Sequence, residues 1–417
     1  MQTNFFSSRR RDILLLVFSI LGVLVLAGGG IYQLIQGITL FTAASKTDST
    51  SSFFGAFCML LCAILLLPSL VYSIRRLKGQ EIPASNLTPV KGWQVGVLLV
   101  AWGLVIVLGL IINNLPNFGW LAALPFFLLE LAIPVAGLVW IAIGGLPTGS
   151  LRRLWAAFGI GMAGSTLVAM LLEGLLVGIA ALAVGIVLVL NPAWLAFLQQ
   201  LKTQIANGGN VQSLLSTLTP YLTNPLVLLL VLVFASILAP IIEETLKPAA
   251  VWLLGKRLRS PAEGFALGAL CGAGFALLEG MLASSGSFQM LGAGLAARAT
   301  SSLMHIMTTG LTGWGIASAR LEKRYGRLAW TYLLSISIHG LWNGSVFLLV
   351  FGALRFTLLG ANSDLLGILF VIAGIGILIS LLLAIMVLLP LMNHRLRPVP
   401  SVTVTSKTGD IIAPPQS

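Results

Sequence analysis

Residues 240–248 read Pro-Ile-Ile-Glu-Glu-Thr-Leu-Lys-Pro and lie inside an apolar run that extends from Leu226 to Gly255. Ionisable side chains inside a membrane helix are costly and are usually functional. In a helix, Glu243 and Lys247 share a face, whereas Glu244 lies about 100° around the axis. We therefore expect the lysine to pair with one carboxylate and to leave the other available. A buried salt bridge that only fixes helix packing is the alternative.

Two prolines bracket these charges. Pro240 and Pro248 have no N–H group, so they release the backbone carbonyls near Ser236 and Glu244 from the helical hydrogen-bond ladder. Inside a membrane such carbonyls need polar partners from the protein or from water. The sequence therefore predicts polar groups beside this stretch.

The composition is typical of an integral membrane protein. Of the 417 residues, 58% are hydrophobic and only 9% are charged, and the mean hydropathy is +1.01. Soluble domains carry about 25% charged residues. We therefore predict an all-α polytopic transmembrane bundle, embedded in the lipid of the cell membrane. Cys58, Cys62 and Cys271 lie in apolar runs and form no metal or disulfide pattern.

Ten apolar runs are long enough to cross a bilayer, for which about 20 residues are needed. The run 155–190 is long enough to raise the question of two crossings. The ten runs are residues 13–26, 53–74, 94–112, 120–144, 155–190, 226–255, 264–283, 292–319, 329–351 and 365–391.

The distribution of basic residues answers that question. If every run crosses once from a cytoplasmic N-terminus, 19 of the 24 Lys and Arg fall in cytoplasmic segments, Lys46, Lys202 and Arg355 fall in outer segments, and Lys247 and Arg298 lie inside spans. This is the positive-inside pattern, which two crossings in 155–190 would spoil. We therefore predict about ten spans with both termini cytoplasmic. Because the net charge of +12 is spread over short clusters between spans, it predicts no nucleic-acid partner.

The chain divides into four predicted parts. Residues 1–150 are accessory N-terminal spans, 151–351 a core with its motifs in 240–343, 352–392 a final span, and 393–417 a disordered cytoplasmic tail. In the outer loop 191–224, apolar and polar residues alternate, which predicts one or two interfacial amphipathic helices. The sequence assigns no oligomeric state.

The run 264–283 carries a stripe of small residues. Gly264, Gly268 and Gly272 recur at every fourth position, which lets another helix approach closely. Phe275 and Glu279 lie on the adjacent row. Glu279 is therefore expected beside a tight helix contact, as a catalytic group or as an interhelical hydrogen-bond partner.

The next run carries a polar stripe. It consists of Arg298, Ser302, His305, Thr309 and Thr312, which lie on one helix face. A polar stripe of that length inside a membrane must face protein or water. Its central imidazole can exchange protons near neutral pH, which favours a functional role over a structural one.

The ninth run carries Ser335, His339 and Asn343, again at every fourth position. A histidine and an asparagine four residues apart can act on one small group, as proton donor and oxyanion donor. By contrast, Glu130 and Glu173 in earlier runs have no partner motif and are interpreted as packing residues.

The polar groups of four successive spans are predicted to lie in one layer. Counting the helical rise of ~1.5 Å per residue from the cytoplasmic ends places them near mid-bilayer. We therefore predict one shared, water-accessible cavity that is reached from the cytoplasmic half. The residues expected to line it are Glu243 or Glu244, Glu279, His305, His339 and Asn343.

In this order, the motifs resemble the PrsW family of intramembrane proteases, relatives of the CAAX-processing and bacteriocin-immunity membrane proteases. The resemblance rests on Glu-Glu-x-x-Lys at 243–247, Phe-x-x-x-Glu at 275–279, His305, and His-x-x-x-Asn at 339–343, and covers about a quarter of the chain. It implies that one of the paired glutamates activates water. Asn343 stands where related proteins often have Asp, which favours an oxyanion role over a metal role.

The resemblance implies an intramembrane endopeptidase whose substrate is a membrane protein or peptide. A proton-coupled transporter and a non-catalytic scaffold are the alternative functions. Catalysis without a metal and catalysis with a divalent metal such as zinc are both open, the ligands in the second case being Glu244, Glu279, His305 and His339. The implied catalytic residues are Glu243, Glu244, Glu279, His305, His339 and Asn343, supported by Lys247, Phe275 and Arg298.

Overall fold

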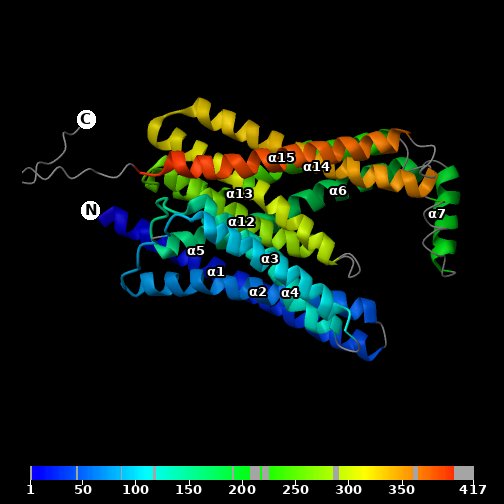
Figure 1. Ribbon diagram of the computed structural model, residues 1–417, viewed down its shortest axis with the longest axis horizontal. Coiled ribbons are helices and arrows are strands. Elements are labelled where there is room, and N and C mark those ends of the chain that lie inside the picture. The colour runs from blue at the N-terminus through cyan, green and yellow to red at the C-terminus, as the bar shows by residue number, and fades with distance from the viewer. Residues whose placement is uncertain are drawn as a thin grey trace, which may run out of the picture.

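Long helices that run side by side make up this structure, a computed structural model (Figure 1). It describes residues 2–43, 46–85, 87–115, 119–189, 192–206, 217, 225–284, 291–359 and 365–398. Within these ranges β structure is limited to an isolated bridge between Ala84 and Ser150, which confirms the predicted all-α class. The helices are α1 (Gln2–Thr42), α2 (Lys46–Leu77), α3 (Gly92–Asn113), α4 (Gly119–Ile143), α5 (Leu151–Gly159), α6 (Thr166–Val189), α7 (Pro192–Ala206), α9 (Pro225–Val233), α10 (Ala239–Leu246), α11 (Ala249–Leu254), α12 (Pro261–Ser284), α13 (Leu291–Glu322), α14 (Tyr325–Leu359) and α15 (Leu365–Leu396), with π turns η1 (Ile160–Ser165) and η2 (Phe234–Leu238) and the 3-10 turn η3 (Gly255–Arg257).

Nine helical segments of the described chain are long and apolar enough to cross a membrane. The remaining predicted run, 292–319, forms α13, which has 32 residues but is not among the nine. Its polar stripe makes it less apolar than the others. The nine segments are residues 12–42, 49–77, 92–113, 119–143, 151–183, 226–254, 261–283, 325–356 and 365–396.

The start of α1 and the end of α15 lie at one end of the bundle, which we call the termini end (Figure 1). A chain that starts and finishes at one end crosses an even number of times, so this arrangement supports α13 as the tenth crossing. The side of the membrane that the termini end faces remains a prediction.

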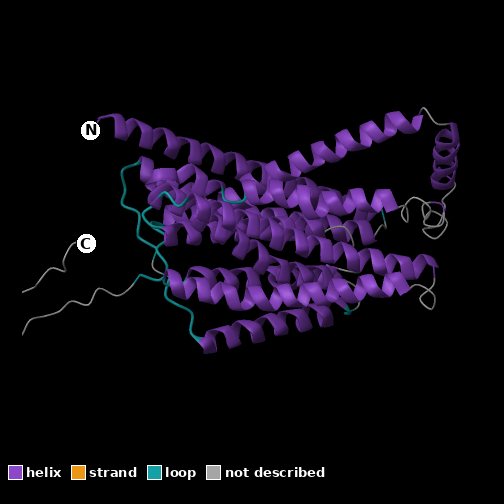
Figure 2. Ribbon diagram, turned by 90° about the horizontal axis from the view of Figure 1, so that it is seen from above, coloured by secondary structure: helices purple, strands orange, loops and turns teal. Residues whose placement is uncertain are grey.

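The long run 155–190 crosses once, as predicted. Helix α5, the π turn η1 and α6 follow one another without a break, and residues 151–183 form one candidate span. In the outer loop, α7 is described, and Figure 2 shows a short helix standing across the ends of the others. Apart from Thr217, residues 207–224 of that loop lie outside the described residues. Residues 399–417 of the predicted tail also lie outside them, whereas Asn393 is buried inside α15.

Helices α12 and α13 form the centre of the bundle. A Cβ atom added at Gly268 would collide with the backbone carbonyl of Thr309, and one added at Gly272 would collide with that of His305. Gly264 meets Gly313 in the same way. The predicted stripe of small residues therefore packs directly on the helix that carries the polar stripe, and any larger residue would separate the two.

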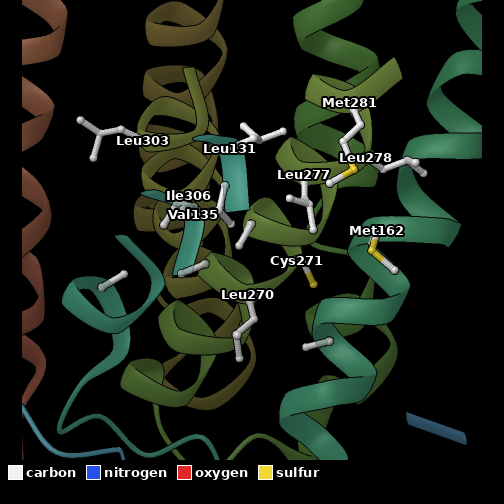
Figure 3. Close-up of a cluster of buried hydrophobic side chains, with 14 of the residues drawn as sticks. Leu131, Val135, Met162, Leu270, Cys271, Leu277, Leu278, Met281, Leu303 and Ile306 are labelled. Atoms are coloured by element: carbon white, nitrogen blue, oxygen red, sulfur yellow. The ribbon is translucent and has the colours of Figure 1, made fainter. Parts of the chain in front are cut away.

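Apolar side chains from other helices close around this pair. Figure 3 shows Leu131 and Val135 together with Leu303 and Ile306, and Met162 close to Cys271. All six side chains are at most 4% exposed. This core holds α12 rigidly between α13 on one side and η1 on the other.

The apolar run that contains the paired glutamates is broken in two places. The π turn η2 ends two residues before Pro240, whose ring cannot coexist with a regular helical bond to the Ser236 carbonyl. The helix stops again between α10 and α11, at Lys247 and Pro248. Irregular backbone at this depth is tolerated where it is buried in protein, and here it lies against α14 and η1.

Candidate active site

The ammonium group of Lys247 lies at the centre of a buried polar cluster. Its Nζ is 2.8 Å from Glu243 Oε2 and 2.9 Å from Glu244 Oε1. It is also 2.7 Å from His305 Nδ1 and 3.3 Å from His339 Nδ1. The lysine side chain is 0% exposed. The expectation that it pairs with one carboxylate is wrong, because at the end of α10 it reaches back to residues three and four positions earlier on one face.

Glu244 is held by three helices. Its Oε1 accepts hydrogen bonds from Thr308 Oγ1 at 3.1 Å and from His339 Nδ1 at 2.9 Å, in addition to the lysine contact. The carboxylate is 0% exposed. A buried charge of this kind is stable only while its partners remain in place. Glu244 therefore fixes the relative positions of α10, α13 and α14.

A second carboxylate holds the other histidine. Glu279 of α12 accepts a hydrogen bond from His305 Nε2 at 3.0 Å and pairs with Arg298 Nη1 at 3.0 Å. The Phe275 ring lies 5.6 Å from the His305 ring and 4.5 Å below the Lys247 ammonium. The structure thus places Phe275 and Arg298 beside the cluster.

The hydrogen-bond partners assign the ring protons of both histidines. Lys247 has only donors, so His305 Nδ1 accepts and the His305 proton lies on Nε2, facing Glu279. Asn343 Nδ2 donates to the Ala235 carbonyl at 3.1 Å and to His339 Nε2 at 3.2 Å. His339 therefore carries its proton on Nδ1. The two imidazoles, whose centroids are 5.2 Å apart, have opposite tautomers.

The polar partners expected near the two prolines are present. Asn343 binds the Ala235 carbonyl, one residue from the carbonyl that Pro240 releases. At the other break, Ser165 Oγ donates to the Leu246 carbonyl at 2.9 Å. The amide of Asn343 has two N–H groups, and both are engaged in this arrangement. Asn343 thus orients His339 rather than offering a free donor.

A cavity of about 440 Å³ ends at this cluster, and Glu279, Arg298, His305 and Asn343 form its polar wall. Its other wall is apolar and includes Val350, which is 64% exposed. The lining residues precede His305 along α13 and follow His339 along α14. Because α14 runs away from the termini end, the cavity extends toward the opposite end of the bundle, unlike the predicted access from the cytoplasmic half.

The donors could hold a metal ion. Glu243, His305 and His339 each offer one ligand atom, and these atoms lie within 4.8 Å of one another. Behind each histidine stands a carboxylate, Glu279 for His305 and Glu244 for His339. A catalytic zinc commonly has three protein ligands, and a carboxylate commonly orients each ligating histidine. This group replaces the predicted ligands Glu244 and Glu279 by Glu243, because those two carboxylates already bind histidine N–H groups.

Two residues of the cluster were not predicted. Glu173 of α6 interacts electrostatically with Glu243, Glu279 and Lys247, although its sequence context suggested packing only. Thr308 binds Glu244 and lies three positions after His305, so its position on the polar face could have revealed it. Glu130 lies outside the cluster, buried on α4, next to Gly109 of α3.

Comparison with known proteins agrees with this geometry. A family model described as "PrsW family intramembrane metalloprotease" matches residues 149–375, more than half of the chain. The match contains every residue of the polar cluster and leaves out α1 to α4. No curated protein and no solved structure matches the chain.

Proposed function

Because the chain belongs to the PrsW family of intramembrane metalloproteases, we propose that its polar cluster hydrolyses a peptide bond of a membrane protein or membrane-bound peptide. One observation carries the proposal. The cavity brings Glu279, Arg298 and His305 together on one wall, where a peptide and a water molecule can meet them. A proteolytic site needs a base for the water, a donor for the oxyanion and an acid for the leaving amine.

In this proposal Glu279 is the carboxylate that takes the proton from water. It lies on the cavity wall with its side chain 26% exposed, and a carboxylate can accept further hydrogen bonds beside those from Arg298 and His305. The same group can then return the proton to the leaving amine. The sequence favoured Glu243 or Glu244 as the base, but neither lines the cavity.

Arg298 is the proposed oxyanion donor. Its guanidinium lines the cavity, is 36% exposed and has N–H groups beyond the one that binds Glu279. A charged donor next to an apolar wall stabilises developing negative charge more strongly than one in water. His339 and Asn343 support the site by fixing the geometry of Glu244 and of the backbone near Ala235.

A divalent metal such as zinc would be held by Glu243, His305 and His339, and when bound it would polarise the peptide carbonyl and acidify a bound water. Glu244 and Glu279 would keep the two imidazoles in place through their other ring nitrogens.

The test is cleavage by purified full-length protein in lipid vesicles, against a panel of single-span membrane proteins. Wild type should cut at least one of them, and His305→Ala should reduce that rate by ~10²-fold or more, as loss of a general acid–base or ligand group does. His394→Ala is the matched control, since this exposed histidine near the end of α15 is far from the cluster. Repeating the cleavage assay with a chelator tests separately whether the activity needs a metal. Wild-type cleavage rates in His305→Ala would refute the proposal.

A further inference from the structure

The Lys247 ammonium fills the space between the residues that could hold a metal. Its Nζ lies 2.8 Å from Glu243 Oε2 and 2.7 Å from His305 Nδ1. Its contact with His339, at 3.3 Å, is with Nδ1, the nitrogen that donates to Glu244. Glu243, His305 and His339 are the residues whose ligand atoms lie within 4.8 Å of one another. While the lysine side chain stays in place it contacts the ligand atoms of Glu243 and His305, and a second cation there would also meet a like charge.

The lysine and a metal would also need the same electron pairs. An ammonium group has three N–H donors and no acceptor, and here Glu243, Glu244 and His305 surround it at hydrogen-bond distance. His305 Nδ1 must therefore direct its lone pair at the lysine, because its other nitrogen gives its proton to Glu279. A metal can be bound only by that same unprotonated nitrogen.

We propose that Lys247 is a resident cation that competes with a divalent metal for Glu243 Oε2 and His305 Nδ1, so that the lysine side chain has to leave the cluster before these two residues and His339 can hold the metal. The proposal rests on the donor set given under the proposed function. It adds that the protein has two exclusive forms of the same site, one held by an ammonium group and one by a metal.

The backbone at Lys247 is interrupted, which favours a rearrangement there. Lys247 stands at the break between α10 and α11, where Pro248 has no N–H to donate, so a rotation there disrupts less helical bonding than one inside a helix. Glu173 of α6 interacts electrostatically with both Lys247 and Glu243.

The exchange has a consequence for stability. Without the lysine, Glu243 and Glu244 remain as two buried carboxylates with no cation beside them, which is strongly unfavourable. A divalent cation would restore the balance. A variant without the lysine should therefore depend on the metal for its folding, whereas the wild type should fold with or without it.

The experiment measures zinc binding to the full-length purified protein by equilibrium dialysis, with the thermal unfolding midpoint followed in parallel. Lys247→Met should bind zinc about tenfold more tightly than wild type or better, because a cation at ~3 Å no longer repels the ion. Its unfolding midpoint should also rise more on zinc addition. Equal or weaker zinc affinity in Lys247→Met would overturn the proposal, as would the absence of zinc binding in every variant.

A charge-balanced pair of variants covers the case in which Lys247→Met does not fold. Glu244→Gln/Lys247→Met removes one charge of each sign and keeps Glu243, His305 and His339. It should bind zinc more tightly than wild type, whereas Glu244→Gln, which keeps the lysine, should not. Equal affinities in these two variants would also overturn the proposal. Zinc binding is measured without a substrate, so it tests only the competition between lysine and metal. Cleavage by wild type in the presence of a chelator would support the protease function even if that competition were disproved.

Discussion

Helix α12 has 89% of its most apolar window buried inside the protein, whereas α3 has 6%. A helix that faces lipid needs large apolar side chains, and α3 presents Leu, Val and Trp almost throughout. A helix that faces other helices needs small residues at which a neighbour can pack closely. In α12 these are glycines, which leave space for the backbone of α13. In this pair the more apolar helix is the exposed one, and the proposed base Glu279 lies on the buried helix α12.

The largest expected effect concerns whether α13 crosses the membrane. Its length favours a membrane span, whereas its composition does not. A reporter inserted after Ser284 and another after Lys323 should read opposite sides of the membrane, an all-or-none result. Reporters after Lys91 and Arg327 should read cytoplasmic, and one near Asn207 external. Ser284 and Lys323 on one side would mean that α13 does not cross and that the predicted ten spans are wrong.

The next largest effect concerns the two kinds of glycine. Gly268→Leu should abolish recovery of folded protein, because even a Cβ at this position collides with the Thr309 backbone. Gly96→Leu on α3 should leave the yield unchanged, because nothing lies within 4 Å of an added Cβ there. Size-exclusion profiles and thermal unfolding in detergent would measure both. Equal yields would remove the basis for treating α12 and α3 as different.

Two glutamates inside apolar helices distinguish a site residue from a packing residue. Glu279→Gln should lower the rate constant for cleavage by ~10²-fold with a similar KM, because a base would be lost and the helix contact kept. Glu130→Gln on α4 should leave cleavage at the wild-type rate, since Glu130 lies outside the cluster. A loss of the same size in both variants, at equal protein yield, would argue against Glu279 as the base.

The smallest effect contrasts two serines. Ser335 Oγ donates to the Thr308 carbonyl at 2.8 Å and accepts from Thr312 at 3.1 Å, all of them buried. Ser335→Ala should lower the unfolding free energy by about 1 to 3 kcal/mol, the cost of leaving buried polar groups without partners. Ser380 on α15 is exposed and bonds only within its own helix, at 2.7 Å, so Ser380→Ala should change stability by a few tenths of a kcal/mol at most. Chemical unfolding curves would compare them.

Periodicity made much of this arrangement predictable. The glycines of α12 recur at every fourth position and the polar residues of α13 at intervals of four and three, so a close helix contact on α12 and one polar face on α13 were predictable from the sequence, although the pairing of these two helices was not. The site was less predictable where it depends on how helices converge. Glu173 enters the cluster because α6 packs against α10, which no local pattern encodes. The same holds for the direction of the cavity, which depends on where α13 and α14 separate.

The π turn η2 can also be regarded as a one-residue insertion. It places an extra residue between α9 and α10, so the two helices are out of phase by about 100°. Deleting a single residue within Phe234–Leu238 would remove the extra residue and rotate the faces of α9 while Glu243 and Lys247 stayed fixed, although Pro240 would still interrupt the helical bonding. The Ser236 carbonyl would then turn away from Gly340, which now packs against it without a side chain. The register between the lipid-facing and the polar halves of this helix is thus set by chain length, and a deletion there would be more damaging than any conservative substitution of the same residues.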